Sequence, residues 1–157
     1  MENNTVKNIG IISDTHGHLN NKIFEIFSNV DLIIHAGDIG NQDILVALRS
    51  LAPVNAVYGN TDRFELRKHL KFLLNFDLLG YTFIVTHMPI KLDQINFDRG
   101  LIKVFGHTHF AEIKAEKDSL VINPGSAGIP QTGGKHSVAV LELSENSAPR
   151  AEIIYFK

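Results

Sequence analysis

The chain has 157 residues, a formal net charge of -2 and 20% charged residues. This length is enough for a single domain with one well-buried core. The charge leaves no broad cationic surface of the kind that holds nucleic acid non-specifically, so long polymers are disfavoured and no stable nucleic-acid binding is expected.

The N-terminal segment and the lack of cysteine indicate the cellular setting. Residues 1–8 are polar and lack the apolar centre of a signal peptide. No apolar stretch approaches the roughly 20 residues that span a bilayer. Without cysteine the chain has neither disulfides nor thiolate ligands. We expect a soluble, cytoplasmic protein with no membrane association, and we leave its oligomeric state open, a homo-oligomer included.

The first half of the chain repeats a strand, a loop and a helix three times. Apolar runs at residues 9–12, 32–34 and 54–57 predict buried strands. Helical spacing of apolar residues predicts helices within 19–27, 44–48 and 64–68. Asn41 can cap the second helix, and Thr61 or Asp62 can cap the third. The three strands should run parallel, because each helix returns the chain in the same direction.

From residue 71 onward the pattern changes to strands separated by turns. The predicted strands cover residues 72–79, 81–86, 102–105, 110–115, 120–122, 137–143 and 153–156. This half has too little helix to cover one wide sheet, so we expect two sheets packed face to face with helices outside. The glycine- and proline-rich stretch at 123–135 predicts a long loop.

Polar side chains of the metal-ligand type follow six apolar runs. They are Asp14 and His16, Asp38, Asn60, His87, His107 and His109, and Asn123. A site built from the ends of several strands is where an open α/β sheet places its chemistry. Any one of these histidines, taken singly, is better explained as a partly buried, hydrogen-bonded side chain than as a metal ligand. Together with the carboxylates they predict a metal-centred enzyme.

Taken in order, the motifs Asp14-x-His16, Gly37-Asp38, Gly59-Asn60-x-Asp62, His87 and Gly106-His107-x-His109 resemble the signature of the calcineurin-like metallophosphoesterases. The Asn123-Pro124-Gly125-Ser126 loop and the small size resemble the compact bacterial and archaeal phosphodiesterase branch. The resemblance extends over nearly the whole chain. It implies an α/β fold of the α+β sandwich type, a four-layer αββα arrangement with two mixed β-sheets flanked by helices.

The resemblance also implies a site with two divalent transition-metal ions. The first ion would be held by Asp14, His16, Asp38 and His109, and the second by Asp38, Asn60, His87 and His107. Manganese is favoured, with nickel, iron or zinc as alternatives. A hydroxide shared by the two ions would attack phosphorus in line with the leaving oxygen. The implied catalytic residues are Asp38, Asn60 and His107, and His18 at the rim either touches substrate or is a solvated loop residue.

The implied substrate is a small phosphodiester or nucleotide. A phosphomonoesterase is the alternative within enzymes, and a non-catalytic scaffold like the retromer subunit is the alternative outside them. Two departures from the family pattern affect the substrate. Thr61 stands where relatives carry histidine or cysteine, and Met88-Pro89 replaces a Gly-His pair. A neutral hydroxyl is a poor general acid at pH 7.

The remaining polar residues receive supporting roles. His35 should pack in the core or behind the ligands, because strand alternation points it away from Asp38. We expect His69 and His136 on the surface. For Asp62 a helix cap is favoured over orienting a ligand. Asn123 and Ser126 should stabilise the glycine-containing loop near the metals, with direct contact to phosphate as the less favoured alternative.

Overall fold

The first half of the chain alternates strands with helices as predicted. The computed structural model describes residues 4–90, 100–117, 119–130 and 133–157. Strands β1 (Val6–Ile12), β2 (Leu32–His35) and β3 (Val54–Ala56) run parallel to one another. The helices between and after them are α1 (Lys22–Ile26), α2 (Gln42–Arg49) and α3 (Phe64–Arg67).

Two of the helix boundaries differ from the prediction. The α2 helix begins as expected, since the Asn41 side chain accepts a hydrogen bond from the Ile44 amide at 3.4 Å. The α1 helix is shorter than the predicted segment 19–27. The prediction that Thr61 or Asp62 caps α3 is wrong, because Arg63 occupies the cap position and makes no side-chain cap bond. The Asp62 carboxylate is bound to backbone amides elsewhere.

The second half completes one sheet and builds another. Strand β9 (His136–Ser144) pairs antiparallel with β1, and β10 (Arg150–Phe156) pairs antiparallel with β9. The order of the first sheet is β10-β9-β1-β2-β3. The second sheet has the order β4-β5-β6-β8-β7, with β5, β6 and β8 parallel. Its strands are β4 (Leu73–Leu78), β5 (Tyr81–Thr86), β6 (Leu101–Val104), β7 (Ala111–Glu116) and β8 (Ser119–Pro124). Both sheets are therefore mixed.

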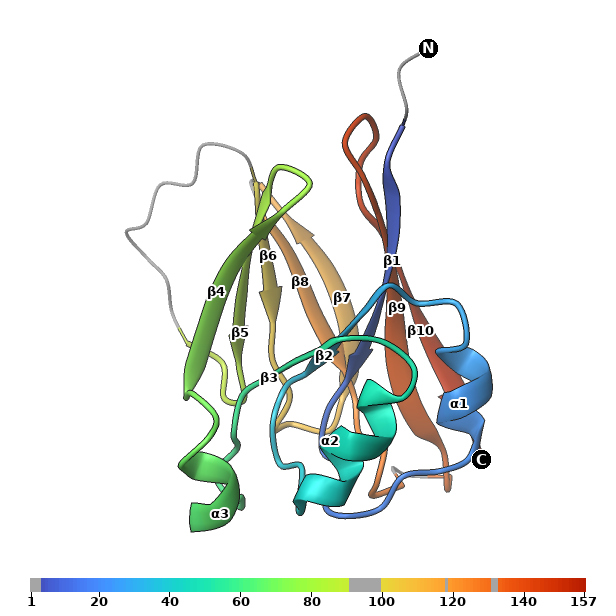
Figure 1. The fold of residues 1–157 in the computed structure, drawn as a ribbon. Helices are drawn as coiled ribbons and strands as arrows, with labels where there is room; N and C mark the ends of the chain where they lie inside the picture. Colours follow the sequence, from blue (N-terminus) through green and yellow to red (C-terminus); the bar gives the residue numbers. More distant parts are fainter. Residues whose placement is uncertain (1–3, 91–99, 118, 131–132) are drawn as a thin grey trace.

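The two sheets pack face to face, with α1 and α2 against the first sheet and α3 below the lower end of β4 (Figure 1). In β2, Ile34 faces the core between the sheets, whereas Ile33 faces the core under the helices. Both side chains are fully buried. A strand covered on both faces reads as a continuous apolar run, which explains the pattern at residues 32–34. The predicted sandwich of two mixed sheets with helices outside is confirmed.

No helix in the described ranges is long and apolar enough to cross a membrane.

Candidate metal centre

The loops that follow five strands bring the predicted ligands together. Asp14 follows β1, Asp38 follows β2, Asn60 follows β3, His87 follows β5 and His107 follows β6. Two groups have ligand atoms that all lie within 4.8 Å of one another: Asp14 with His16 and His109, and Asp14 with Asp38 and His87. Asn60 Oδ1 lies 3.1 Å from His107 Nδ1, and the His107 ring lies 5.3 Å from that of His87. The structure thus brings all seven predicted ligands into one cluster.

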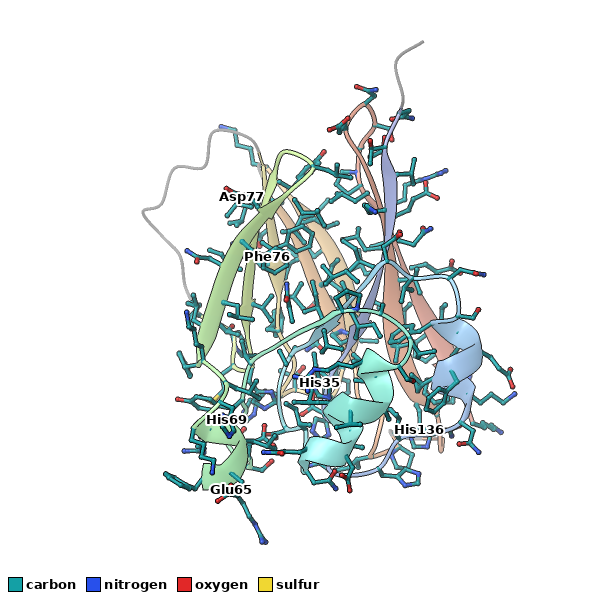
Figure 2. All side chains as sticks on the ribbon, in the orientation of Figure 1. His35, Glu65, His69, Phe76, Asp77 and His136 are labelled. Carbon is teal, nitrogen blue, oxygen red and sulfur yellow. The ribbon has the colours of Figure 1, made fainter. Side chains whose placement is uncertain are left out.

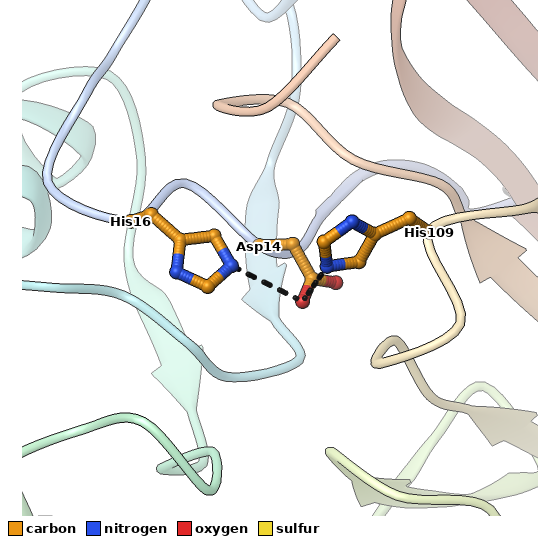
Figure 3. A group of neighbouring side chains, drawn as sticks. All are labelled: Asp14, His16 and His109. Atoms are coloured by element: carbon orange, nitrogen blue, oxygen red, sulfur yellow. Dashed lines mark ion pairs between the residues drawn. The ribbon is translucent and has the colours of Figure 1, made fainter. Parts of the chain in front are cut away.

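Asp14 is central to this cluster. Its Oδ1 lies 3.1 Å from His109 Nε2 and 3.8 Å from His16 Nε2 (Figure 3). The other oxygen, Oδ2, accepts hydrogen bonds from the Ser13 hydroxyl at 2.6 Å and the His107 amide at 3.2 Å. One oxygen is therefore held by the protein while the other faces the imidazoles.

Asp38 divides its two oxygens in the same way. Oδ1 accepts a hydrogen bond from the Thr61 amide at 2.9 Å. Oδ2 lies 3.2 Å from His87 Nε2 and 3.8 Å from His16 Nε2. Asp38 thus faces one histidine from each of the two predicted ligand sets.

His87 is oriented through its other ring nitrogen. Its Nδ1–H donates to the Ala36 carbonyl at 2.7 Å, which turns Nε2 toward the two carboxylates. Asp14 Oδ1, His16 Nε2 and His87 Nε2 are buried and lack a hydrogen-bond partner. Leaving a buried polar atom unpaired costs about 1–3 kcal/mol. Buried carboxylate and imidazole lone pairs that face one another in this way fit a divalent cation.

The electrostatics of the cluster also favour a cation. Burial alone would raise the pKa of Asp38, but the neighbouring His87 and the Thr61 amide outweigh it and lower the pKa. Burial alone would lower the pKa of His87, but Asp38, Asp14 and the Ala36 carbonyl outweigh it and raise the pKa. The two shifts have one cause: the ionised carboxylates favour positive charge beside them, which a divalent cation would supply.

The backbone is strained at the candidate ligands. Among the described residues, six non-glycine residues have a positive φ, and five of them are candidate ligands: Asp14, His16, Asp38, His107 and His109. Such conformations cost on the order of 1–3 kcal/mol each and persist where the surroundings enforce them. The amides of Asp14 and His16 donate to the carbonyls of Gly37 and Asp38 at 3.0 and 2.9 Å. The first two ligand loops therefore hold each other in place.

His35 supports the same two loops from behind. The imidazole is fully buried, and its Nδ1 accepts a hydrogen bond from the Gly37 amide at 3.1 Å. Its Nε2–H therefore donates to the Thr15 hydroxyl at 3.0 Å, which in turn donates to the Ile39 carbonyl at 2.8 Å. Burial lowers the pKa of His35 to about 3. The predicted place of His35 behind the ligands is confirmed.

Asp62 joins the loops that follow β2 and β3. Its Oδ1 accepts from the Gly40 amide at 2.9 Å, and its Oδ2 accepts from the Gly59 amide at 2.8 Å. The favoured prediction of a helix cap is wrong, because both oxygens are engaged with loop amides. Arg67, which the motifs did not reveal, binds the carbonyls of Asn60 and Asp62 at 2.9 and 2.6 Å. The Arg67 side chain thus binds loop carbonyls, and no sequence motif predicts such contacts.

The glycine-containing loop is held as predicted. The Asn123 amide group donates to the Gly106 carbonyl at 3.1 Å and to the Thr108 hydroxyl at 2.8 Å. The Ser126 hydroxyl donates to the Asp14 carbonyl at 3.2 Å. Both residues therefore tie the loop to the ligand-bearing segments.

The other histidines are only in part where the sequence places them. His18 is exposed, and its contact with substrate stays a prediction. His69 is exposed as expected. His136 was expected on the surface, but it is half-buried and stacks on Phe156 with ring centroids 5.5 Å apart.

Two proteins of known sequence are similar to this chain over most of its length. A probable metallophosphoesterase from Methanocaldococcus jannaschii is 35% identical over 156 residues, covering 93% of this chain and 80% of that protein. A phosphodiesterase from the same organism is 34% identical over 149 residues, covering 80% of this chain and 90% of that protein.

Solved structures share the fold. An archaeal phosphodiesterase has a TM-score of 0.74 at 27% identity, covering 94% of this chain and 99% of the other. Vacuolar Protein Sorting 29 from Cryptosporidium parvum has the same TM-score at 15% identity, covering 96% of this chain and 98% of the other, and is similar in fold alone. The calcineurin-like phosphoesterase superfamily domain matches residues 8–146. The chain therefore belongs to the calcineurin-like phosphoesterase superfamily.

Proposed function

We propose that the protein is a metal-dependent phosphodiesterase that hydrolyses small phosphodiesters or nucleotides at a two-metal centre. The observation that carries the proposal is the set of buried, unpartnered atoms that face one another: Asp14 Oδ1, His16 Nε2 and His87 Nε2. Native proteins rarely leave such atoms unsatisfied. Within a phosphoesterase family, a bound metal is the natural partner for them.

The first ion would be held by Asp14, His16, Asp38 and His109, and the second by Asp38, Asn60, His87 and His107. The position of Asp38 Oδ2 beside His16 and His87 supports its role as the shared ligand. Imidazole, carboxylate and amide donors suit manganese, iron, nickel or zinc better than magnesium or calcium. We propose manganese.

When bound, two such cations lower the pKa of a shared water and offset the charge that develops on the phosphoryl oxygens. The protein holds the carboxylate ligands in fixed orientations. Asp14 and Asp38 each present one oxygen inward while a hydrogen bond fixes the other. Asn60 and His107 are exposed and hydrogen-bonded to each other, so they stand on the open side that a substrate must approach.

One observation supports a diester as the substrate, and a second limits the leaving group. A relative that is 34% identical is named a phosphodiesterase. Thr61 is exposed beside Asn60, and its hydroxyl cannot act as a strong proton donor at pH 7. Activated diesters, whose leaving groups need little protonation, fit this site best.

Metal analysis of the purified protein, followed by assay of a chromogenic phosphodiester and its monoester with added manganese, tests the proposal. Asp38→Asn should lower metal content, and it should lower turnover by more than about a hundredfold. Substituting a residue that only orients a metal ligand already lowers metal affinity or activity ~10–100-fold, and Asp38 is a ligand itself. Circular dichroism should show an intact fold. Two bound metals with near-native turnover in this variant would contradict the assignment, and faster monoester hydrolysis would favour a phosphomonoesterase.

Asp77→Asn is the matched control. Asp77 is exposed on β4, far from His35 and the ligand loops, and accepts a hydrogen bond only from Thr82 among the contacts described (Figure 2). This variant should retain metal and turnover.

A further inference from the structure

A surface beside the candidate metal centre combines basic and aromatic side chains. We call it the basic–aromatic surface, and it consists of Tyr58, Phe64, Arg67, Lys68 and Phe72. The Arg67 guanidinium lies over the Tyr58 ring at 5.1 Å, and the Lys68 ammonium lies 5.9 Å from the centre of the Phe64 ring. The rings of Tyr58 and Phe72 are 6.2 Å apart. Phe64 and Phe72 are 73% and 47% exposed, unusually open for phenylalanine.

This surface is continuous with the ligands. Arg67, which stacks on Tyr58, also donates to the carbonyl of Asn60 at 2.9 Å. The Tyr58 amide donates to the Lys71 carbonyl at 3.1 Å, which brings Tyr58 alongside the segment that contains Phe72. Phe64 and Arg67 of α3 and the C-cap residue Lys68 share one side, because residues three and four apart are neighbours on a helix. A molecule bound at Asn60 would therefore reach the surface directly.

The charge of the segment differs from that of the whole chain. Residues 58–72 carry a net charge of +2, against -2 for all 157 residues. Of its two acidic side chains, Asp62 is buried against loop amides and Glu65 pairs with Lys68 at 2.8 Å. The basic side chains are all exposed: Arg63, Arg67, Lys68 and Lys71.

Exposed aromatic faces among cationic groups are how proteins bind single-stranded nucleic acid without reading its sequence. Bases stack on the rings, and the cations follow the phosphates. We propose that the basic–aromatic surface binds the bases next to the scissile phosphate, so that the substrate is a short single-stranded oligonucleotide. This inference rests on the proposed phosphodiesterase function. The basic–aromatic surface covers only a small part of the protein, which agrees with the expectation of no broad cationic surface.

Fluorescence anisotropy with the purified protein tests the inference. The probe is a labelled thymidine hexamer with phosphorothioate linkages, which resist hydrolysis, and it is compared with an abasic hexamer of equal charge. The thymidine hexamer should bind more tightly. Phe64→Ala and Phe72→Ala should each weaken its binding about five- to hundredfold, the range measured for loss of one stacked base, and should leave the abasic hexamer unaffected.

Tyr155→Ala is the matched control. Tyr155 is 54% exposed with the Lys135 ammonium 6.0 Å from its ring centre, but it lies on β10, at the opposite edge of the first sheet from β3. It should leave hexamer binding unchanged. Equal affinity for the two hexamers, or an equal loss in Tyr155→Ala, would overturn the inference. Binding is measured without turnover, so a protein that hydrolyses diesters but fails this test refutes the surface and not the phosphodiesterase.

Discussion

At the scale of single residues, five candidate ligands adopt a backbone conformation that most side chains avoid. Asp14 and Asp38 have φ values of 55° and 53°, and each carboxylate also has one oxygen fixed by a hydrogen bond. The cluster is thus pre-organised by the protein's own contacts. The residue types of the site could be predicted from the sequence, because the motifs name them. Their left-handed backbone could not, since it is enforced by contacts between loops.

In the proposed reaction, Thr61 is the residue whose chemistry most limits which leaving groups can depart. If no group protonates the leaving oxygen, turnover should depend steeply on leaving-group pKa, and alkyl diesters should be nearly inert. Thr61→His would supply a protonatable imidazole, and general acid help is typically worth ~10²–10⁴ in rate, with less expected in a pocket not adapted to it. The gain should be confined to poor leaving groups. Turnover of a series of diesters in both variants measures it.

A shallow dependence on leaving-group pKa in the native protein would contradict this prediction. It would mean that another residue already donates the proton. His18, which is exposed beyond His16, is then the first residue to substitute.

At the scale of elements, the loops after β2 and β3 approach each other more closely than a side chain allows. A Cβ atom on Gly59 would lie 2.1 Å from Asp38 Oδ1, and a Cβ on Gly37 would lie 2.8 Å from His87 Cβ. The glycines of the Gly37-Asp38 and Gly59-Asn60 pairs are therefore required because no larger side chain fits at either position. Asp62 adds hydrogen bonds across the same gap to Gly40 and Gly59.

Gly59→Ala should displace the Asp38 carboxylate and weaken metal binding more than about tenfold, the lower bound for disturbing a ligand's support. Calorimetric metal titration measures the affinity. Gly80→Ala is the control. Its φ of 83° makes alanine unfavourable there, a strain that Gly59 lacks, but no atom lies within 4 Å of the added methyl. It should cost about 1–2 kcal/mol of stability and leave metal affinity unchanged. Native metal affinity in Gly59→Ala would refute the packing argument.

The elements show where prediction from sequence stops. Strands are announced by local apolar runs, and β5 lies at Tyr81–Thr86 as predicted. The role of Asp62 depends on a hydrogen bond to Gly40, 22 residues away, so its position before α3 suggested a cap instead. Contacts between residues this far apart in the sequence cannot be predicted without the three-dimensional structure.

At the scale of the whole molecule, the candidate centre joins the two sheets. Its ligands follow β1, β2 and β3 of one sheet and β5 and β6 of the other. The His107 amide, beyond β6, donates to Asp14, beyond β1. Packing of the sheets therefore sets the geometry of the site. The sequence predicted two sheets, but the placing of β8 between β6 and β7 follows from packing and was not predictable.

His35 makes the stability of the molecule depend on pH. Its pKa is about 3 in the folded protein, against an ordinary value of 6.5. Between these values the unfolded chain binds a proton at this residue and the folded protein does not. The stabilisation that the neutral His35 gives to the folded protein is therefore complete above pH 6.5 and declines as the pH falls toward 3. If the unfolded chain binds one more proton than the folded protein, the free energy of unfolding falls by about 1.4 kcal/mol for each pH unit.

His35→Gln should remove this slope while keeping an amide that can donate to Thr15. Urea unfolding of the metal-free protein, from neutral pH to about pH 4.5, gives the free energy of unfolding for both proteins. We expect the native protein to lose stability faster than the variant as the pH falls, by up to about 1.4 kcal/mol per pH unit. His69→Gln, at an exposed histidine, is the control and should follow the native curve. Parallel curves for the native protein and His35→Gln would mean that the buried imidazole takes up its proton without unfolding, and that the hydrogen bonds of His35 to Gly37 and Thr15 give way in the folded state.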